Sequence, residues 1–430
     1  MQTRSMKIRQ GGHDSSIELP PVPLEERYAC AWAALRRDKI NIPDIRADQR
    51  FDFSGSLRYD EMTGYRTVSM LVIPMLNDRG ALIGVMQLIN ALDGEGKVIP
   101  FEKEEELLIA AIASQAAISI TNIQYTNQIS TLLNSLVQAL STAVDERSAY
   151  TGNHTRRMVR LAGLFLDWLA ETGHPWSFSQ ERRSAFLMSV WLHDIGKLTI
   201  PLEVMDKATR LGDRKLELLN RLRFIGVLDR VALLEGKISP EEWSKRNHHR
   251  EEIRDFILEI DGGRPLSDAD RERVEKIAGL TYIDENRETH PWITDTERDC
   301  LLIGKGTLTQ SERAVMESHV VMTKRILDQV TFPPAYEKVP AWVAAHHEFL
   351  NGSGYPEHMT AEAIAPEARL LTILDVFEAL TAKDRPYKGP MPAEKAFLTL
   401  HDMAEKGQID NDTLSLFEKS RVWEPVSQKT

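Results

Sequence analysis

The chain has 430 residues, of which 42% are hydrophobic and 27% are charged, and its formal net charge at pH 7 is −11. This length allows two domains with a sizeable core, and the composition is that of an ordinary globular protein. The acidic balance argues against a binder of nucleic acid polymers, because neutralising a phosphate backbone needs a basic face. A small anionic ligand is compatible with this charge if local Lys and Arg residues surround it.

The N-terminus and the cysteines indicate the compartment. Residues 1–27 are polar and contain Pro20, Pro21 and Pro23, which predicts a flexible tail without helix or strand. No apolar stretch approaches the roughly 18 residues that a spanning helix requires. The cysteines, Cys30 and Cys300, lie far apart, so neither a disulfide framework nor a thiolate metal site is predicted. We therefore expect a cytoplasmic protein with no export signal and no membrane span.

A hairpin and a helix are predicted after the tail. Val68–Leu76 and Ala81–Asn90 have the composition of buried strands, and Asn77–Gly80 between them supplies the residues of a turn. An amphipathic helix follows from Glu102 to Ile123. This order resembles the second half of a GAF sensory domain, and the most specific stretch is Gly84–Asn90. The resemblance implies an α+β sensory domain that is shortened at its N-terminus.

Helical patterns dominate the rest of the chain. Apolar residues recur at helical spacing from Ile129 to Val144, which predicts one continuous helix into the next domain. That apolar stripe either pairs with a second copy, forming a homodimer, or packs on the following domain. From Asp145 onward strand signals nearly vanish, so this domain is expected to be almost all α. Residues 212–304, rich in Arg, Glu and Asp, are interpreted as a helical insertion on its outside, available to a partner protein.

Histidine and aspartate residues recur in a pattern that packing does not explain. A single buried His or Asp is more often a satisfied core residue. Here His154, the adjacent pair His193 and Asp194, and Asp375 follow one another along the chain. A buried imidazole beside a buried carboxylate needs a compensating charge, and a divalent metal is the usual one. The order of these residues resembles the HD metal-dependent phosphohydrolase superfamily.

Further segments make this resemblance more specific. With the insertion set aside, it covers nearly all of residues 140–420. These segments are Gly306–Thr309 before Glu312 and His319, His346-His347-Glu348 before Asn351–Pro356, and Asp384–Lys388 after Asp375. In this order they resemble the HD-GYP family. Members of that family hydrolyse cyclic dinucleotides, chiefly cyclic di-GMP, with a cluster of two or three metal ions held by carboxylates and imidazoles.

The resemblance assigns a set of metal ligands: His154, His193, Asp194, His319, His346, His347 and Asp375. Imidazoles and carboxylates without thiolates suit iron or manganese, and Asp194 is the natural bridge between two such ions. A pair of divalent ions lowers the pKa of a water and aims it at phosphorus. Family members with a third metal carry a Glu four residues before the first His, where this chain has Tyr150. Two divalent ions, iron or manganese, are therefore expected.

Cations and a glycine-rich turn are expected on the substrate side. Lys197, one helical turn after His193, is expected to face the cavity and to clamp the scissile phosphate; its alternative is a solvated lysine. The expected catalytic residues are Lys197 and Asp194. Glu348 is expected to orient a ligand histidine. A turn rich in glycine lets backbone amides approach a phosphate closely, and an arginine can bind a phosphate bidentately. The expected substrate contacts are Lys197, Lys207, Gly352, Gly354, Tyr355, Arg385 and Lys388.

The predicted fold is multidomain: an α+β GAF-like domain, a connecting helix and an all-α HD-type domain with a helical insertion. The boundaries are a tail at 1–27, the GAF-like domain at 28–124, the connecting helix at 125–145, and the catalytic domain at 146–425 with its insertion at 212–304. The resemblance implies hydrolysis of cyclic di-GMP to linear pGpG, with or without further cleavage to GMP. Three alternatives stay open: a phosphodiesterase for 3'3'-cyclic GMP-AMP, a receptor without hydrolysis, and a nucleotide phosphohydrolase of the wider superfamily.

Overall fold

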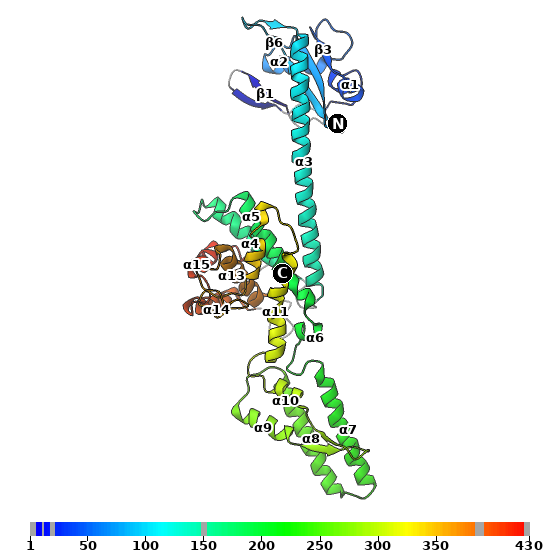
Figure 1. Ribbon diagram of the computed structural model, residues 1–430, viewed down its shortest axis with the longest axis vertical. Helices are drawn as coiled ribbons and strands as arrows, with labels where there is room; N and C mark the ends of the chain where they lie inside the picture. The colour runs from blue at the N-terminus through cyan, green and yellow to red at the C-terminus, as the bar shows by residue number, and fades with distance from the viewer. Residues whose placement is uncertain (1–5, 11–12, 18–21, 148–152, 383–390, 425–430) are drawn as a thin grey trace. The chain divides into compact units, whose positions relative to one another are not determined.

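The chain forms two compact units, residues 1–133 and residues 134–430. A computed structural model describes the chain apart from residues 1–5, 11–12, 18–21, 148–152, 383–390 and 425–430 (Figure 1). The first unit contains a β-sheet, whereas helices dominate the second. This division agrees with the expected α+β and α-helical parts.

A three-stranded antiparallel sheet is the centre of the first unit. Its order is β3 (Ile40–Ile42), β4 (Met70–Leu76) and β5 (Leu82–Ile89), with β4 in the middle. Both predicted strands of the hairpin are thereby confirmed to within two residues. Successive side chains of a strand point to opposite faces, so β4 serves two cores. Met70 and Val72 pack under α1 (Ala29–Arg36), and their neighbours in β4 pack against α3 (Lys103–Asp145).

The first unit also holds elements that were not predicted. They are α2 (Ser54–Thr63), the pair β6 (Ala91–Leu92) and β7 (Val98–Ile99), and the antiparallel pair β1 (Met6–Gln10) and β2 (His13–Ile17). The last pair lies within residues 1–27, for which the sequence predicts a tail without strands. That prediction of secondary structure is corrected, while the domain boundary at residue 28 stays a prediction.

The helix α3 is continuous over 43 residues, as the apolar spacing predicts (Figure 1). Among the described residues it is the one helix long and apolar enough to cross a membrane, with an 18-residue window of mean hydropathy 1.5. No such segment is predicted from the sequence, so the structure differs on this point. Length and composition alone are weak evidence for a span, and Ala113 and Ala117 of α3 are fully buried against the sheet.

The second unit packs its helices around buried aromatic and aliphatic side chains. Phe377 contacts Phe397 and Phe417, and Phe417 contacts Phe165. The helices are α4 (His154–Glu171), α5 (Gln180–Leu192), η1 (Ile195–Thr199), α6 (Leu202–Met205), α11 (Gln310–Leu327), η2 (Pro334–Tyr336), α12 (Val339–Ala344), α13 (Pro366–Thr381), α14 (Ala393–Glu405) and α15 (Asn411–Ser420). The candidate site lies where η1 packs closely against α11.

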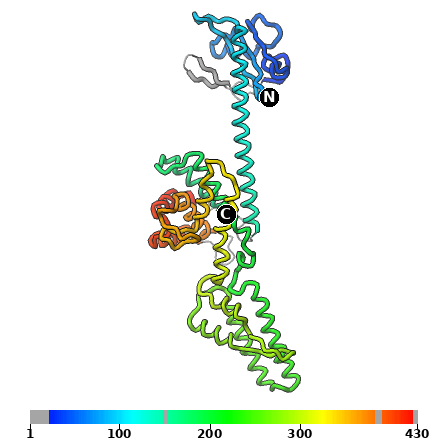
Figure 2. The backbone as a smooth tube through the Cα atoms, viewed as in Figure 1, coloured from blue at the N-terminus to red at the C-terminus, as the bar shows by residue number. Residues whose placement is uncertain are grey.

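The insertion is a helical subdomain with a core of its own. Figure 2 shows the chain running out after α6 and returning into α11. It comprises α7 (Arg214–Leu234), α8 (Pro240–Asp261), α9 (Asp268–Ala278), the hairpin β8 (Thr281–Ile283) and β9 (Thr289–Pro291), and α10 (Asp295–Leu301). The hairpin makes the C-terminal unit slightly less than all α. At the base, the buried guanidinium of Arg210 donates to the carbonyls of Ile260, Arg264 and Ile303.

Candidate metal centre

One group of potential ligands comes from three helices. His154 is the first residue of α4, His193 follows α5 directly, and Asp375 lies within α13. One ligand atom from each lies within 4.8 Å of the others. The Nε2 atom of His154 is 3.4 Å from Nε2 of His193 and 3.3 Å from a carboxylate oxygen of Asp375. These distances suit ligand atoms arranged around one shared cation better than atoms joined by hydrogen bonds to one another.

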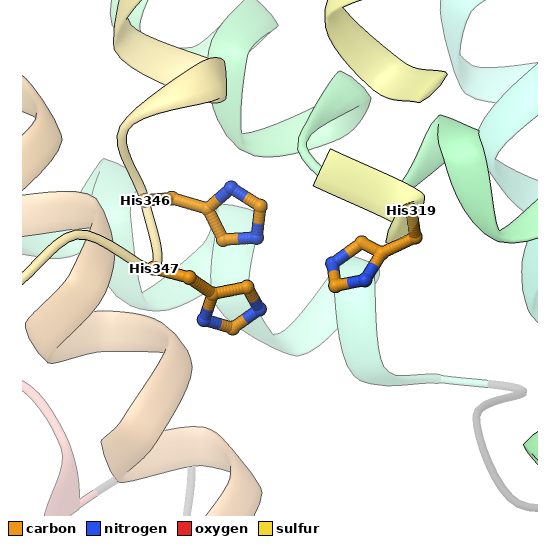
Figure 3. Close-up of side chains that lie close together, drawn as sticks. All are labelled: His319, His346 and His347. Carbon is orange, nitrogen blue, oxygen red and sulfur yellow. The ribbon is translucent and has the colours of Figure 1, made fainter. Parts of the chain in front are cut away.

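A second group consists of three histidines. His319 lies on α11, and the adjacent pair His346 and His347 follows α12. Their ligand atoms also lie within 4.8 Å of one another, and Figure 3 shows the His346 and His347 rings on one side and His319 on the other. His319 and His346 are buried. The structure therefore gathers distant segments of the chain into two ligand groups.

Two carboxylates connect these groups. One oxygen of Asp194 lies 3.2 Å from Nε2 of His193, and the other lies 3.4 Å from Nε2 of His319. Asp375 places one oxygen 3.3 Å from His154 and the other 4.0 Å from His347. Each carboxylate thus directs one oxygen to the first ligand group and the other oxygen to the second. This arrangement can hold two divalent cations side by side with carboxylate bridges.

Backbone carbonyls set the orientation of three imidazoles. The Nδ1 atoms of His193, His319 and His346 lie 2.8, 2.6 and 2.6 Å from the carbonyl oxygens of the residues three positions earlier. A carbonyl oxygen only accepts hydrogen bonds, so each Nδ1 carries the proton. The Nε2 atom then keeps a free lone pair, which is what metal coordination requires.

Several of these potential ligand atoms are buried without a hydrogen bond. Within the described part of the chain, Oδ1 of Asp194 and the Nε2 atoms of His319 and His346 have no hydrogen-bond partner. Leaving a buried polar atom unpaired costs about 1–3 kcal/mol. Divalent cations would satisfy all three atoms at once, so the residues present fit a metal cluster.

In the second ligand group the protonation states suit metal binding, for which imidazoles must be neutral and carboxylates charged. Burial holds the pKa of His346 well below its usual value, and it lowers the pKa of His347 to about 4. Burial alone would raise the pKa of Asp194. The nearby His193 and Lys197 outweigh burial and hold that pKa well below the ordinary range. The second histidine group is therefore uncharged at neutral pH beside a charged carboxylate.

The two expected lysines that lie within the described residues have different surroundings. Lys197, on η1, lies with Nζ 2.5 Å from Oδ2 of Asp194, so it faces the ligand cluster as expected. The side chain of Lys207 is 1% exposed, and its Nζ lies 2.6 Å from Glu312 and 3.7 Å from Sγ of Cys300. Its charge is neutralised inside the protein, which does not support the expected contact with substrate.

The glycine-rich turn is packed against the histidine pair. A Cβ on Gly354 would lie 2.5 Å from the carbonyl oxygen of His347 and 2.3 Å from the amide nitrogen of Phe349. The ring of Tyr355 stacks on that of His347 with centroids 4.9 Å apart. Gly352 has φ +77°, which favours glycine. This turn supports the His347 ring, whereas its expected contacts with substrate stay predictions.

Glu348 has a role other than the expected one. Its carboxylate accepts hydrogen bonds from the amides of Glu357 at 2.6 Å and Met359 at 2.9 Å. It closes the turn instead of orienting a ligand histidine, so that expectation is wrong. The carboxylate that does contact a ligand is Glu378, whose Oε2 accepts from Nδ1 of His154. No spacing in the sequence singled out Glu378.

Sequence reasoning also missed the contact that brings α11 to the site. The amide of Gly196 donates to Oγ1 of Thr323 at 2.9 Å, and that hydroxyl donates to the carbonyl of His193 at 3.2 Å. The position of Gly196 directly after His193-Asp194-Ile195 was the available signal. Among the residues considered for the site, Tyr150, Arg385 and Lys388 lie outside the described residues.

Comparisons with known proteins agree with the two-part architecture. A model of the GAF domain matches residues 8–120, and a model of the HD domain matches residues 300–413. The second match contains His319, His346, His347 and Asp375, while the remaining potential ligands precede the insertion. The GAF match begins inside the segment that the sequence predicts as a tail.

Curated relatives match over limited stretches. The 3'3'-cGAMP-specific phosphodiesterase 3 of Vibrio cholerae is 27% identical over 41% of this chain and 35% of its own length. The cyclic di-GMP phosphodiesterase of Thermotoga maritima is 33% identical over 25% of this chain and 29% of its own. The cyclic di-GMP phosphodiesterase response regulator RpfG of Xanthomonas campestris is 36% identical over 26% and 28%. The chain thus spans about a third of the length of these relatives.

These matches cover both units, and the HD match contains the second histidine group together with Asp375. The chain therefore contains a GAF domain and an HD domain, and its sequence is similar to that of bacterial cyclic dinucleotide phosphodiesterases.

Proposed function

We propose that this protein is a metal-dependent phosphodiesterase that opens cyclic di-GMP to the linear dinucleotide. The observation that carries the proposal is the pair of ligand groups joined by the carboxylates of Asp194 and Asp375. Such a cluster suits the displacement of an oxygen at phosphorus, where charge on both the entering and the leaving oxygen must be stabilised. The names of the curated relatives support the same substrate class.

Each part of the site has a role in this proposal. The ligands of two divalent ions, iron or manganese, would be His154, His193, Asp194, His319, His346, His347 and Asp375. When bound, the ions supply Lewis-acid activation of a water and of the phosphoryl oxygen. The chain itself contributes Lys197, whose ammonium group lies beside Asp194 with its side chain 22% exposed. From there it can neutralise a phosphate oxygen as negative charge develops.

A second candidate substrate is 3'3'-cyclic GMP-AMP, because a relative specific for it matches the longest stretch of this chain among those compared above. Both dinucleotides present the same phosphodiester to the cluster. Their bases differ, and the cations expected to contact bases or phosphate, Arg385 and Lys388, lie outside the described residues. A receptor without hydrolysis is disfavoured, because it has no chemical need for unpaired, buried imidazole nitrogens such as Nε2 of His346.

The function is tested by anaerobic turnover of cyclic di-GMP by iron- or manganese-loaded protein, with chromatography of the products. The His193→Ala/Asp194→Ala variant should form no linear product. Its matched control is His248→Ala/His249→Ala, which removes an adjacent pair of exposed histidines from α8 and should keep full activity. Equal rates in both variants would contradict the proposed site. Parallel assays with 3'3'-cyclic GMP-AMP separate the two substrates.

We also propose a cytoplasmic location and a dimer. Cys30 and Cys300 are free thiols, as a reducing compartment allows. Ile129, Leu132 and Leu136 on α3 are more than half exposed, which supports a helix of a second copy as their cover. Light scattering after size exclusion tests this: Leu132→Glu/Leu136→Glu should convert a dimer into a monomer, and an unchanged mass would contradict it. A protein partner at the insertion stays a prediction.

A further inference from the structure

A buried carboxylate outside the ligand set touches the first ligand histidine. Glu378 lies three residues after Asp375 on α13 and is 2% exposed. Its Oε2 accepts a hydrogen bond from Nδ1 of His154, and its Oε1 accepts one from Nε of Arg157. Both oxygens therefore already have a partner. Glu378 cannot become a ligand unless it releases one of these partners.

The contact explains how the His154 ring is oriented. The other ligand histidines with a fixed Nδ1 use a carbonyl three residues earlier, but α4 begins at His154, so no preceding turn of its own helix offers such an acceptor. A carboxylate from α13 takes that place. With the Nδ1 proton held by Glu378, the lone pair of Nε2 points toward His193 and Asp375, at 3.4 and 3.3 Å.

Arg157 completes the arrangement from the same helix as His154. It lies three residues further along α4, and residues at this spacing share a helix face. Its guanidinium compensates the charge of Glu378, which would otherwise be costly to bury. The carboxylate is thus fixed between two side chains of α4, and a change in its length or charge must reach the His154 ring.

We propose that Glu378 is a positioning residue of the metal centre, which holds the imidazole of His154 with Nε2 turned toward the cation of the first ligand group. The proposal rests on the proposed metal centre and not on the identity of the substrate. Mutation of hydrogen-bond partners of this kind typically lowers metal affinity by about 10–100-fold. The affected ion should be the one bound by His154, His193 and Asp375, while the three-histidine group keeps its own.

The experiment is a titration of the metal-free full chain with cobalt(II), read by visible absorption and by metal content after dialysis against a competing chelator. The wild type should bind two ions. Glu378→Gln should keep one tight ion and bind the other about 10–100-fold more weakly, with an altered absorption band. The matched control is Glu367→Gln. Glu367 lies on the same helix and is also buried, but its carboxylate pairs with Arg182, at 2.7 Å, and not with a ligand histidine. This control should lose thermal stability and keep both ions.

A second variant separates positioning from charge and from folding. Glu378→Asp keeps the negative charge beside Arg157 but withdraws the carboxylate from His154 by one methylene group. It should weaken the binding of the same ion as Glu378→Gln does. It also tests the positioning role if Glu378→Gln does not fold. Wild-type cobalt affinity and spectrum in a folded variant of either kind would overturn the proposal. A wild type that binds no cobalt would instead contradict the metal centre itself, whereas normal cobalt binding without turnover would contradict only the proposed function.

Discussion

Gly196 is the position at which a single methyl group should separate the two halves of the metal centre. A Cβ there would lie 2.0 Å from the carbonyl oxygen of His319 and 2.6 Å from both the amide nitrogen and Oγ1 of Thr323. Contacts under 3.0 Å are essentially never made by real Cβ atoms, and two of these three neighbours are backbone atoms. Gly196→Ala must therefore push η1 and α11 apart by about 1 Å.

The consequence for the site follows from what the two elements carry. Asp194 directly precedes η1 and His319 lies on α11, and their facing atoms are 3.4 Å apart. Overpacking of this kind costs about 1–3 kcal/mol of stability. A displacement of about 1 Å at a catalytic centre can lower turnover by about 100-fold. We expect Gly196→Ala to lose both stability and the tight binding of at least one ion.

The assay combines thermal unfolding of the metal-free chain, cobalt(II) titration and turnover. The matched control is Gly163→Ala in α4, because a Cβ on Gly163 would meet only Nη2 of Arg183, at 3.9 Å. That substitution should raise stability by about 0.5–1 kcal/mol through helix propensity. If Gly196→Ala unfolds at the wild-type temperature and binds two ions with unchanged affinity, the reasoning about the contact between η1 and α11 is refuted.

Further predictions concern the ion pair below the insertion and the glycine-rich turn. Burial raises the pKa of Glu312, but its ion pair with Lys207 outweighs burial and holds the folded pKa below the ordinary 4.5. Stability from this pair is present above pH 4.5 and is lost as the pH falls through the folded pKa. Glu312→Gln should therefore cost about 3 kcal/mol at pH 7 and progressively less below pH 4.5, measured by urea unfolding across pH; a difference independent of pH would contradict this. Gly354→Ala should displace the turn that supports His347 and weaken one bound ion, whereas Gly352→Asn, which tolerates a positive φ, should change metal affinity little. Equal metal affinities in these two variants would argue against the packing role of Gly354.

The sequence was most informative where chemistry and periodicity act locally. The β4–β5 hairpin follows from two apolar runs around Asn77–Gly80, whose turn is closed by the Asn77 side chain accepting from the amides of Arg79 and Ala81. The unbroken α3 follows from its spacing of apolar residues. The expected ligand set came from the resemblance to a known family, whose motifs occur in the same order on both sides of the insertion.

Contacts between distant segments were not predictable in the same way. Lys207 reads as a free cation in the sequence, and only the fold brings Glu312 and Cys300 to it. Two glutamates, Glu348 and Glu378, show the same limit of sequence reasoning. Glu348 stands beside the histidine pair but points into the turn, whereas Glu378 reaches His154 from 224 positions away. Neighbourhood in sequence does not determine which carboxylate touches which ring.

The most direct test of the central claim measures turnover of cyclic di-GMP against the number of ions bound per chain, as iron or manganese is added anaerobically to metal-free protein. A centre built from two ligand groups joined by Asp194 and Asp375 predicts linear product that rises with the second ion. Full turnover with one ion bound, or no turnover of cyclic di-GMP with two, would contradict the account.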